Sequence, residues 1–354
     1  MRGQWRTFLL WTAVAVALSG AFWYRLDWSL TRESLRRVNV PVVLLAILPI
    51  LLTYLTRSLR WRAFLAPVGS PALGNTIAAT VIGFSTIFVF GRIGEAARPL
   101  VLSLRERIRP SATIATILIE RICDMLAVAL AFALSLSLVS GSGDLHQPPA
   151  AFARLGEAAL ALSLLGLVGL SALRSRADGI VDLLRQRMLG LPRKLRQPIL
   201  NLLRHLAEGI SALRDTRALA RIAGYTVLTW GLVVLSFWLV AFAFGLRLTV
   251  ASVIFVIGFA MAGSLVPTPG GSAGAFHTMT MLGLMGLGIE KNKAASMALI
   301  LHLVSFGPAV LVSPCFFRRE GLSWATLREL MRAETALAEP TSGEGGVAAR
   351  TNRE

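Results

Sequence analysis

Six long apolar runs constrain this chain more than any other feature of its sequence. A helix of about 20 residues crosses a hydrocarbon core about 30 Å thick. Hydrophobic residues make up 55% of the 354 residues and charged residues only 16%, so polar side chains cannot cover the apolar surface in water. The sequence therefore predicts an all-α, polytopic integral membrane protein. The expected spans are Thr7–Tyr24, Val40–Thr56, Ala112–Val139, Ala158–Leu173, Ile222–Phe244 and Ala294–Phe317.

The charge balance is strongly basic, with 36 Lys and Arg against 19 Asp and Glu and a net charge of +17. In a water-soluble protein this excess would suggest a nucleic-acid partner. Membrane proteins, however, concentrate Lys and Arg in their cytoplasmic loops, so no nucleic-acid partner is expected here. With two cysteines, four histidines and no cluster of either, neither a metal site nor a cofactor is expected.

Two further apolar segments are not simple spans. Thr76–Phe90 has only fifteen residues before Gly91-Arg92, and Ala251–Gly288 is cut by a Pro- and Gly-rich break. Proline removes a backbone donor and glycine weakens a helix. Broken backbone at membrane depth is tolerated where it is buried in protein or lines a wet cavity. Both segments are therefore predicted to be re-entrant, that is, to enter and leave the membrane on the same side.

Loop charges predict the orientation of these segments. Residues 174–221 contain eleven Lys and Arg against four acidic residues, and residues 91–110 contain five Arg, so both stretches should be cytoplasmic. The first re-entrant segment then enters from the cytoplasm and the second from outside, an inverted arrangement typical of transporters. Both chain termini are expected in the cytoplasm, and the membrane is expected to be the cell inner membrane.

The predicted domain organisation is simple. Residues 1–318 form one transmembrane domain, within which residues 178–218 read as an amphipathic stretch on the inner leaflet. Residues 319–354 form a cytoplasmic tail, which is predicted to be disordered from about residue 338 because its composition is polar and Gly-rich.

Arginines gather at the end of the second run. Arg57 lies deepest and is a candidate contact for a lipid headgroup. Arg60 and Arg62 are expected to extend along the helix end to the membrane surface, because long basic side chains reach water in this way.

Two more charged clusters follow. Arg92, Glu95 and Arg98 are spaced three apart, so they share one face of a helix, and guanidinium groups bind phosphate through paired donors. A third cluster, Glu120, Arg121 and Asp124, lies inside an apolar run. A charged side chain there is costly unless it is paired, and it suggests a functional site. Arg92 and Arg98 are candidate headgroup contacts. Glu95, Glu120, Arg121 and Asp124 are predicted to support them, and a purely structural ion-pair network remains an alternative.

The break in Ala251–Gly288 carries no Gly-Lys-Ser/Thr and is therefore not a nucleotide-binding loop. His277 lies about one turn into the following helix and is either a proton site or a helix hydrogen-bonding residue. The re-entrant loop residues are Pro267, Pro269, Gly270, Gly271, Gly274 and His277.

The ordered set Arg57-x-x-Arg60-Trp61, Gly91-Arg92-x-Gly94-Glu95-x-x-Arg98-Pro99, Glu120-Arg121-x-x-Asp124 and Pro267 through His277 resembles the lysylphosphatidylglycerol synthase transmembrane region, a flippase-like family. The resemblance covers about residues 8–318. It implies a polytopic inner-membrane protein with re-entrant segments that is associated with moving lipids between leaflets. Few residues follow Phe317, so the aminoacyl-transferase domain of the bifunctional members is not expected here.

The function expected from these features is translocation of an anionic or phosphate-bearing lipid between the leaflets of the inner membrane, without an enzymatic activity. The lipid could be a phospholipid or a polyprenyl- or hopanoid-type lipid, and the chain could form a homo-oligomer. Two alternatives remain open. One is a membrane enzyme that acts on a lipid phosphate through Glu120 and Asp124; the other is a non-transporting subunit of an envelope lipid synthesis complex.

Overall fold

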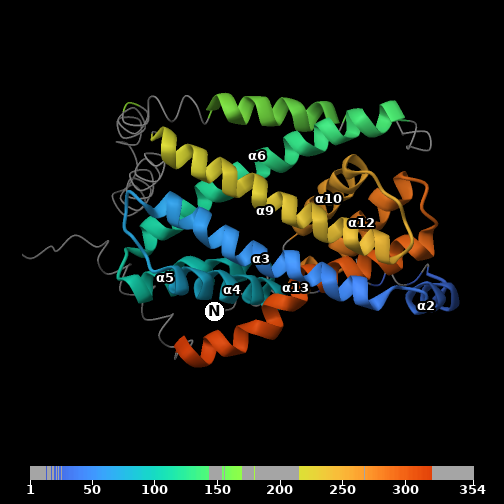
Figure 1. Cartoon of the computed structure of the whole chain (residues 1–354), viewed down its shortest axis with the longest axis horizontal. Coiled ribbons are helices and arrows are strands. Elements are labelled where there is room, and N and C mark those ends of the chain that lie inside the picture. The colour runs from blue at the N-terminus through green and yellow to red at the C-terminus, as the bar shows by residue number, and fades with distance from the viewer. Residues whose placement is uncertain are drawn as a thin grey trace, which may run out of the picture.

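Every regular element in the described part of the chain is a helix, which confirms the all-α prediction (Figure 1). The computed structural model describes residues 26–142, 156–169 and 215–320 apart from Pro267, and single residues at 13, 17, 20, 22, 24, 154 and 179. The helices are α2 (Trp28–Arg36), α3 (Val40–Leu65), α4 (Leu73–Phe90), η1 (Gly91–Ala96), α5 (Ala97–Glu106), α6 (Pro110–Ser142), α9 (Thr216–Ala243), α10 (Val250–Ser264), α11 (Pro269–Ser272), α12 (Ala275–Gly286) and α13 (Lys291–Glu320).

Four helices, α3, α6, α9 and α13, are long and apolar enough to cross a membrane. They match four of the six predicted spans, and the chain is therefore a multi-pass membrane protein. The run Ala158–Leu173 corresponds to a shorter apolar helix, Gly156–Gly169. Most of Thr7–Tyr24 lies outside the described residues, as do most of the amphipathic stretch 178–218 and the tail beyond residue 320.

Helices α3 and α9 pack along each other in opposite directions (Figure 1). Asn39 caps α3 by accepting the Val42 N–H, and its own N–H donates to the carbonyl of Ala243 at the end of α9. Further along, the hydroxyls of Thr56 and Thr229 lie 2.7 Å apart. The exposed Asn39 contact joins the ends of the two spans, and the buried Thr56–Thr229 contact fixes their register, because an unpaired polar group costs more in an apolar interior than in water.

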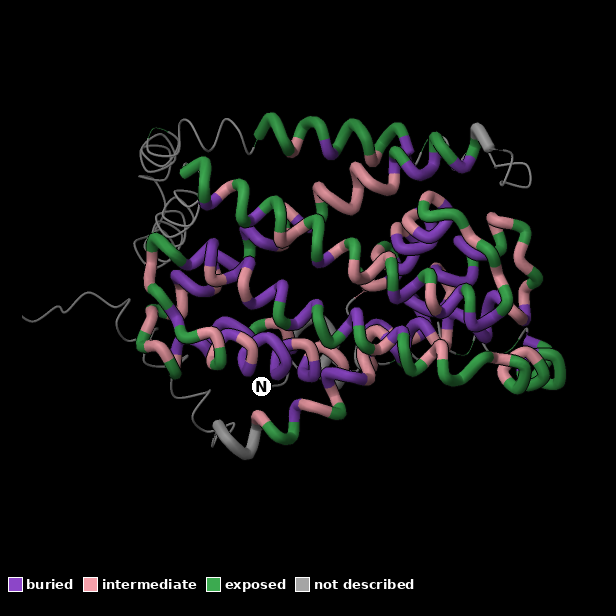
Figure 2. The backbone as a smooth tube through the Cα atoms, viewed as in Figure 1, coloured by how far each residue is buried: buried purple, intermediate pink, exposed green. Residues whose placement is uncertain are grey.

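Burial follows the expectation for a bundle in lipid. The inner faces of the bundle are buried, whereas one face of α9 and most of the helix Gly156–Gly169 are exposed (Figure 2). Large apolar side chains such as Val227 and Leu311, with 73% and 79% of their surface exposed, point away from the protein. Lipid tails are the solvent that makes such exposure favourable.

Helices α4, η1 and α5 form a first hairpin whose tip is η1. Its two arms approach so closely that a Cβ added at Gly83 would lie 2.7 Å from the Cβ of Arg98. At the base, the Glu106 carboxylate accepts hydrogen bonds from the Ala72 N–H and from the Asn75 side chain. The short apolar segment predicted from the sequence is therefore one arm of a helical hairpin.

Helices α10 and α12 form a second hairpin whose tip is α11. The backbone there is not a continuous helix: Gly270, Gly271 and Gly274 have φ values of 74°, 63° and 81°. L-residues rarely adopt a positive φ, so glycine favours the reversal; Ser272, in the same tip, also has a φ of 62°. The predicted break at the Pro- and Gly-rich segment is confirmed, although Pro267 itself lies outside the described residues.

The two hairpins lie toward opposite ends of the bundle (Figure 1). The α11 tip packs against α4 and η1. The base of the second hairpin leads into Asn292 of α13, whose side chain accepts the Asp27 N–H next to α2. The base of the first hairpin lies at the other end, beside the loop that follows α3. This arrangement places irregular backbone from both hairpins in the interior of the bundle.

Candidate functional site

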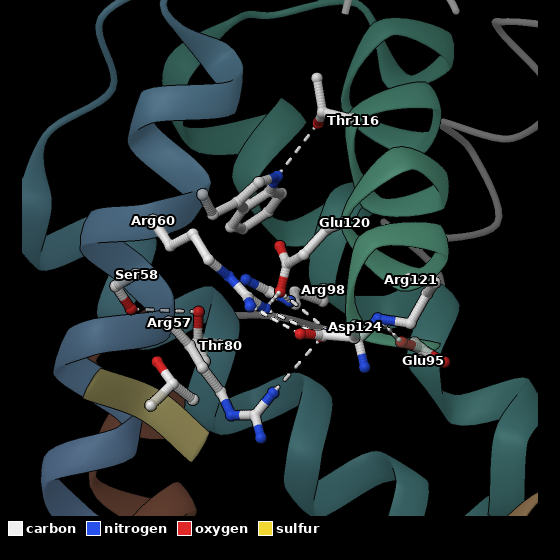
Figure 3. A network of polar contacts seen from close by, with 12 residues as sticks. Arg57, Ser58, Arg60, Thr80, Glu95, Arg98, Thr116, Glu120, Arg121 and Asp124 are labelled. Atoms are coloured by element: carbon white, nitrogen blue, oxygen red, sulfur yellow. Dashed lines mark hydrogen bonds and ion pairs between the residues drawn. The ribbon is translucent and has the colours of Figure 1, made fainter. Parts of the chain in front are cut away.

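Seven charged side chains meet in the interior next to the first hairpin tip (Figure 3). They come from α3, η1, α5 and α6, and each arginine lies beside at least one carboxylate. We call this set the charged network. Its members are Arg57, Arg60, Glu95, Arg98, Glu120, Arg121 and Asp124.

Arg60 lies at the centre of the charged network with none of its surface exposed. Its Nη1 donates to Oδ1 of Asp124 at 2.6 Å, and its Nη2 donates to Oδ2 of the same carboxylate at 2.9 Å. Nη2 also donates to Oε1 of Glu120 at 2.8 Å. This paired geometry is the strong form of the Arg–carboxylate interaction, so Arg60 ties α3 to α6.

One oxygen of Glu120 accepts hydrogen bonds from three arginines. Oε1 lies 3.0 Å from Nη1 of Arg98, 2.9 Å from Nη2 of Arg121 and 2.8 Å from Nη2 of Arg60. Arg121 also lies 3.2 Å from Glu95 of η1 and 3.1 Å from Asp124. The network therefore joins the first hairpin, through η1 and α5, to the long span α6.

Arg57 is bound less tightly than the other arginines. Its Nη1 lies 3.9 Å from Oδ2 of Asp124, too far for a hydrogen bond. Its guanidinium instead lies near two rings, 5.1 Å from the centre of Phe84 and 5.8 Å from that of Trp230. Such cation–π contacts hold the group in place, and they leave its hydrogen-bond donors available.

Aromatic side chains hold the rest of the charged network. The Arg98 guanidinium stacks 4.3 Å from the centre of Trp61, whose Nε1 donates to Thr116 of α6. Trp230 of α9 donates its Nε1–H to Oδ1 of Asp124 at 3.2 Å. Because these rings pack on the charged groups and bond to neighbouring helices, they fix the orientation of the guanidinium planes.

Several buried polar atoms of the network have no hydrogen-bond partner among the described residues. They include Nε and Nη2 of Arg98, Nε of Arg57 and Oε2 of Glu120. Four guanidiniums face three carboxylates, so the described members also carry an excess of one positive charge. Of the four named atoms, the three arginine nitrogens are donors and Oε2 of Glu120 is an acceptor. An unpaired buried donor is costly, and an anion with several acceptor oxygens is the ligand that the arginine donors fit.

The structure brings together six of the seven predicted headgroup and supporting residues: Arg57, Glu95, Arg98, Glu120, Arg121 and Asp124. The side chain of the seventh, Arg92, lies outside the described residues, although its backbone belongs to η1.

The prediction for Arg60 was wrong. Arg60 does not extend to the membrane surface, because two carboxylates of α6 bind it inside the bundle. Its spacing of three from Arg57 was the signal available in the sequence, since that spacing places both on one helix face. Trp230 and Thr226, whose hydroxyl lies 3.3 Å from Nη1 of Arg60, were also missed, and nothing in their local sequence marks them.

Two histidines, rather than Arg and carboxylate side chains, lie at the second hairpin tip. The rings of His277 and His302 lie 4.6 Å apart, among phenylalanines. His302, on α13, was not singled out from the sequence. The predicted loop residues Gly270, Gly271 and Gly274 form the tip beside this pair, while the side chain of Pro269 lies outside the described residues. No group of three or more His, Cys, Asp or Glu suited to a metal occurs in the described ranges.

Comparison with known proteins extends these observations. The chain matches the family model for the lysylphosphatidylglycerol synthase TM region over residues 9–313. No curated protein and no solved structure matches it. The match spans both hairpins and all members of the charged network.

Proposed function

Because this chain belongs to the lysylphosphatidylglycerol synthase TM region family, we propose that it translocates an anionic or phosphate-bearing lipid between the leaflets of the cell inner membrane. The observation that carries this proposal is the charged network, a buried set of arginines with unpaired donors and one excess positive charge. The ligand is a phospholipid or a polyprenyl- or hopanoid-type lipid whose phosphate the network binds.

Arg57, Arg98 and Arg92 are the proposed headgroup contacts. Arg57 makes no hydrogen bond in the described part of the chain, and Arg98 leaves Nε and Nη2 unpaired. A phosphate oxygen placed near them would satisfy these donors through charge-assisted hydrogen bonds. Arg60 uses both of its Nη atoms on carboxylates and therefore holds the site together rather than binding the ligand.

The two hairpins are the proposed path. We infer that each is re-entrant, α4–α5 from the cytoplasmic side and α10–α12 from outside, with both chain termini in the cytoplasm. The tip-to-tip contact between α11 and η1 supports this inverted arrangement. Lipid-exposed irregular backbone is unfavourable in hydrocarbon, so two buried tips at mid-bundle are typical of a polar passage.

The network is better suited to binding than to catalysis. Three arginine nitrogens occupy one oxygen of Glu120, and Arg60 binds both oxygens of Asp124. A carboxylate held between guanidiniums in this way is a poor general base, because their positive charges stabilise its ionised form. We therefore propose that the chain is not an enzyme.

A reconstituted translocation assay tests the proposal. Purified protein is placed in vesicles that contain a fluorescent phosphatidylglycerol, and an external quencher reports how fast the inner-leaflet lipid becomes accessible. Arg57→Lys, Arg92→Lys and Arg98→Lys keep the charge but lose the planar paired donors. Each is expected to slow translocation about tenfold, the effect of losing one charge-assisted hydrogen bond.

Arg62→Lys is the matched control. Arg62 lies near the end of α3, the helix that carries Arg57, and is not a member of the charged network. It should translocate at the parent rate. Parent-like rates in the Arg57→Lys, Arg92→Lys and Arg98→Lys proteins would exclude the phosphate site. Mass spectrometry of the recovered lipid separates the alternatives: an altered headgroup indicates an enzyme. Unaltered lipid with no translocation by folded parent protein indicates a non-transporting subunit.

A further inference from the structure

The charged network reaches the surface of the bundle at one edge. Five of its seven side chains have at most 9% of their surface exposed. Arg121 and Glu95 differ from these five, with 25% and 19% of their side-chain surface exposed. In the view of Figure 3 this pair lies beside α6, on the opposite side of the network from Arg60. The contact between Glu95 and Arg121 therefore forms the open edge of the network.

The open edge is held less tightly than the centre. Nε of Arg121 lies 3.2 Å from Oε1 of Glu95 but makes no hydrogen bond among the described residues. Arg60, in contrast, makes hydrogen bonds of 2.6 to 2.9 Å to two carboxylates. If Glu95 moved away, Arg121 would keep its hydrogen bond to Glu120 and its ion pair with Asp124. The edge can therefore open while the rest of the network stays assembled.

The surface around the open edge is apolar. Leu118, Ile122 and Met125 are exposed, and their spacing of four and three residues places them on one face of α6. We call these three residues the α6 face. Arg121 comes three residues after Leu118 and four before Met125, so it lies on the same face. A partly exposed ion pair is thus surrounded by side chains that suit lipid tails.

The lengths of two spans place the open edge near the level of the lipid headgroups. An α-helix rises about 1.5 Å per residue. The stretch of α6 from Arg121 to Ser140 therefore covers about 29 Å, and the stretch of α3 from Val40 to Arg60 covers about 30 Å. Both lengths match a hydrocarbon core about 30 Å thick. Because Val40 and Ser140 belong to the same end of the bundle (Figure 1), the charged network lies near the opposite boundary of the hydrocarbon.

A phosphate-bearing lipid of the adjacent leaflet matches both properties of this place. Its phosphate lies at the boundary of the hydrocarbon, where the guanidinium of Arg121 is partly exposed, and guanidinium groups bind phosphate through paired donors. Its acyl chains extend from that boundary into the hydrocarbon, as does the α6 face. The excess positive charge of the network attracts an anionic headgroup rather than a neutral one.

We propose that the open edge and the α6 face form a lateral entrance, through which a phosphate-bearing lipid passes from the bilayer to the charged network. This inference deepens the proposed function and rests on it, because it assigns a route and a docking surface to the same lipid. The phosphate first binds Arg121 in place of Glu95. It then reaches Arg98, which shares Oε1 of Glu120 with Arg121 and has two unpaired donor atoms. The acyl chains remain against the α6 face.

Crosslinking at the α6 face tests the entrance through binding rather than transport. Cys123 and Cys315 are replaced by Ala, Ile122→Cys is introduced, and a benzophenone is attached to the new thiol. The protein is placed in neutral galactolipid vesicles that contain equal small amounts of phosphatidylglycerol and diacylglycerol with the same acyl chains. After illumination, mass spectrometry should find about tenfold more phosphatidylglycerol than diacylglycerol on the protein, the preference that one charge-assisted hydrogen bond provides.

Leu134→Cys is the matched control, because Leu134 is also exposed on α6 but lies about 18 Å further along the helix. It should crosslink the two lipids in equal amounts. Equal amounts at Ile122→Cys would overturn the entrance, and so would the same phosphatidylglycerol preference at both positions.

The crosslinking result and the translocation result can fail separately. A phosphatidylglycerol preference at Ile122→Cys without translocation by the parent protein would overturn the proposed function and leave the docking surface in place. Translocation by the parent protein without that preference would overturn the entrance alone.

Discussion

Arg60 and Asp124 are 64 positions apart in the sequence, yet two parallel hydrogen bonds of 2.6 and 2.9 Å join them. Both are buried, with 0% and 4% of their surface exposed. Burying two charges is expensive, and their attraction compensates only when the geometry is good and the remaining donors and acceptors are used. Glu120, Arg121 and Trp230 supply those further contacts.

Removing Arg60 should therefore destabilise the protein strongly. Arg60→Ala removes a positive charge that offsets the cost of burying the Asp124 and Glu120 carboxylates. Losing one partner of a buried pair costs about 3–5 kcal/mol. The free energy of unfolding in mixed micelles would measure the loss. Arg62→Ala, two residues further along α3, should change it by less than about 1 kcal/mol. Equal losses in the two variants would contradict the central position of Arg60.

Replacing Glu120 with Gln should also be costly. The change removes one negative charge that three arginines share, so the network is left with two excess positive charges. We expect a loss of about 3–5 kcal/mol, visible as a lower melting temperature. Glu33→Gln is the control, because Glu33 forms an exposed i,i+4 pair with Arg37 on α2 and such pairs contribute about 0.3–0.5 kcal/mol. Similar melting shifts would argue against the shared-carboxylate arrangement.

The first hairpin should be sensitive to a single methyl group at Gly83. Its Cβ would lie 2.7 Å from Arg98 Cβ, so Gly83→Ala must push the arms apart at a cost of about 1–3 kcal/mol. Arg98 would also move relative to Glu120, and translocation should slow. Gly74→Ala lies in the same helix with nothing within 4 Å and should stabilise the protein or leave it unchanged. A stable, fully active Gly83→Ala protein would contradict the close packing.

The proposed orientation can be tested with single cysteines. The native Cys123 and Cys315 are first replaced by Ala, and one cysteine is introduced at an exposed position near either end of the bundle. Arg247→Cys, in the loop between α9 and α10, should react with an impermeant reagent applied outside the cell. Arg109→Cys, before α6, should react only after permeabilisation. The reverse pattern would invert the orientation.

Much of the helical architecture could be predicted from the sequence. Runs of apolar residues identify α3, α6, α9 and α13 as spans, because length and hydropathy are local properties. The break near Gly270 could also be predicted, since Pro and Gly disrupt a helix wherever it packs. Charged residues inside apolar runs, such as Glu120 and Asp124, predicted that these carboxylates have partners in the interior, because an unpaired charge there is costly, and the ion pairs to Arg60 confirm it.

The pairing of those charges depended on the tertiary structure. Arg60 looks the same in the sequence as Arg62, and only the packing of α3 on α6 puts the first on two carboxylates and leaves the second out of the network. His302 is the one histidine of the long helix α13, and its contact with Gly271 requires α13 to pass the second tip. The spacing of residues in the sequence shows which of them share one face of a helix. Which side chains that face contacts depends on which helices pack against it. The sequence alone therefore determined where the chain is helical and that Glu120 and Asp124 lie within an apolar span, and the tertiary structure decided which charges are buried together.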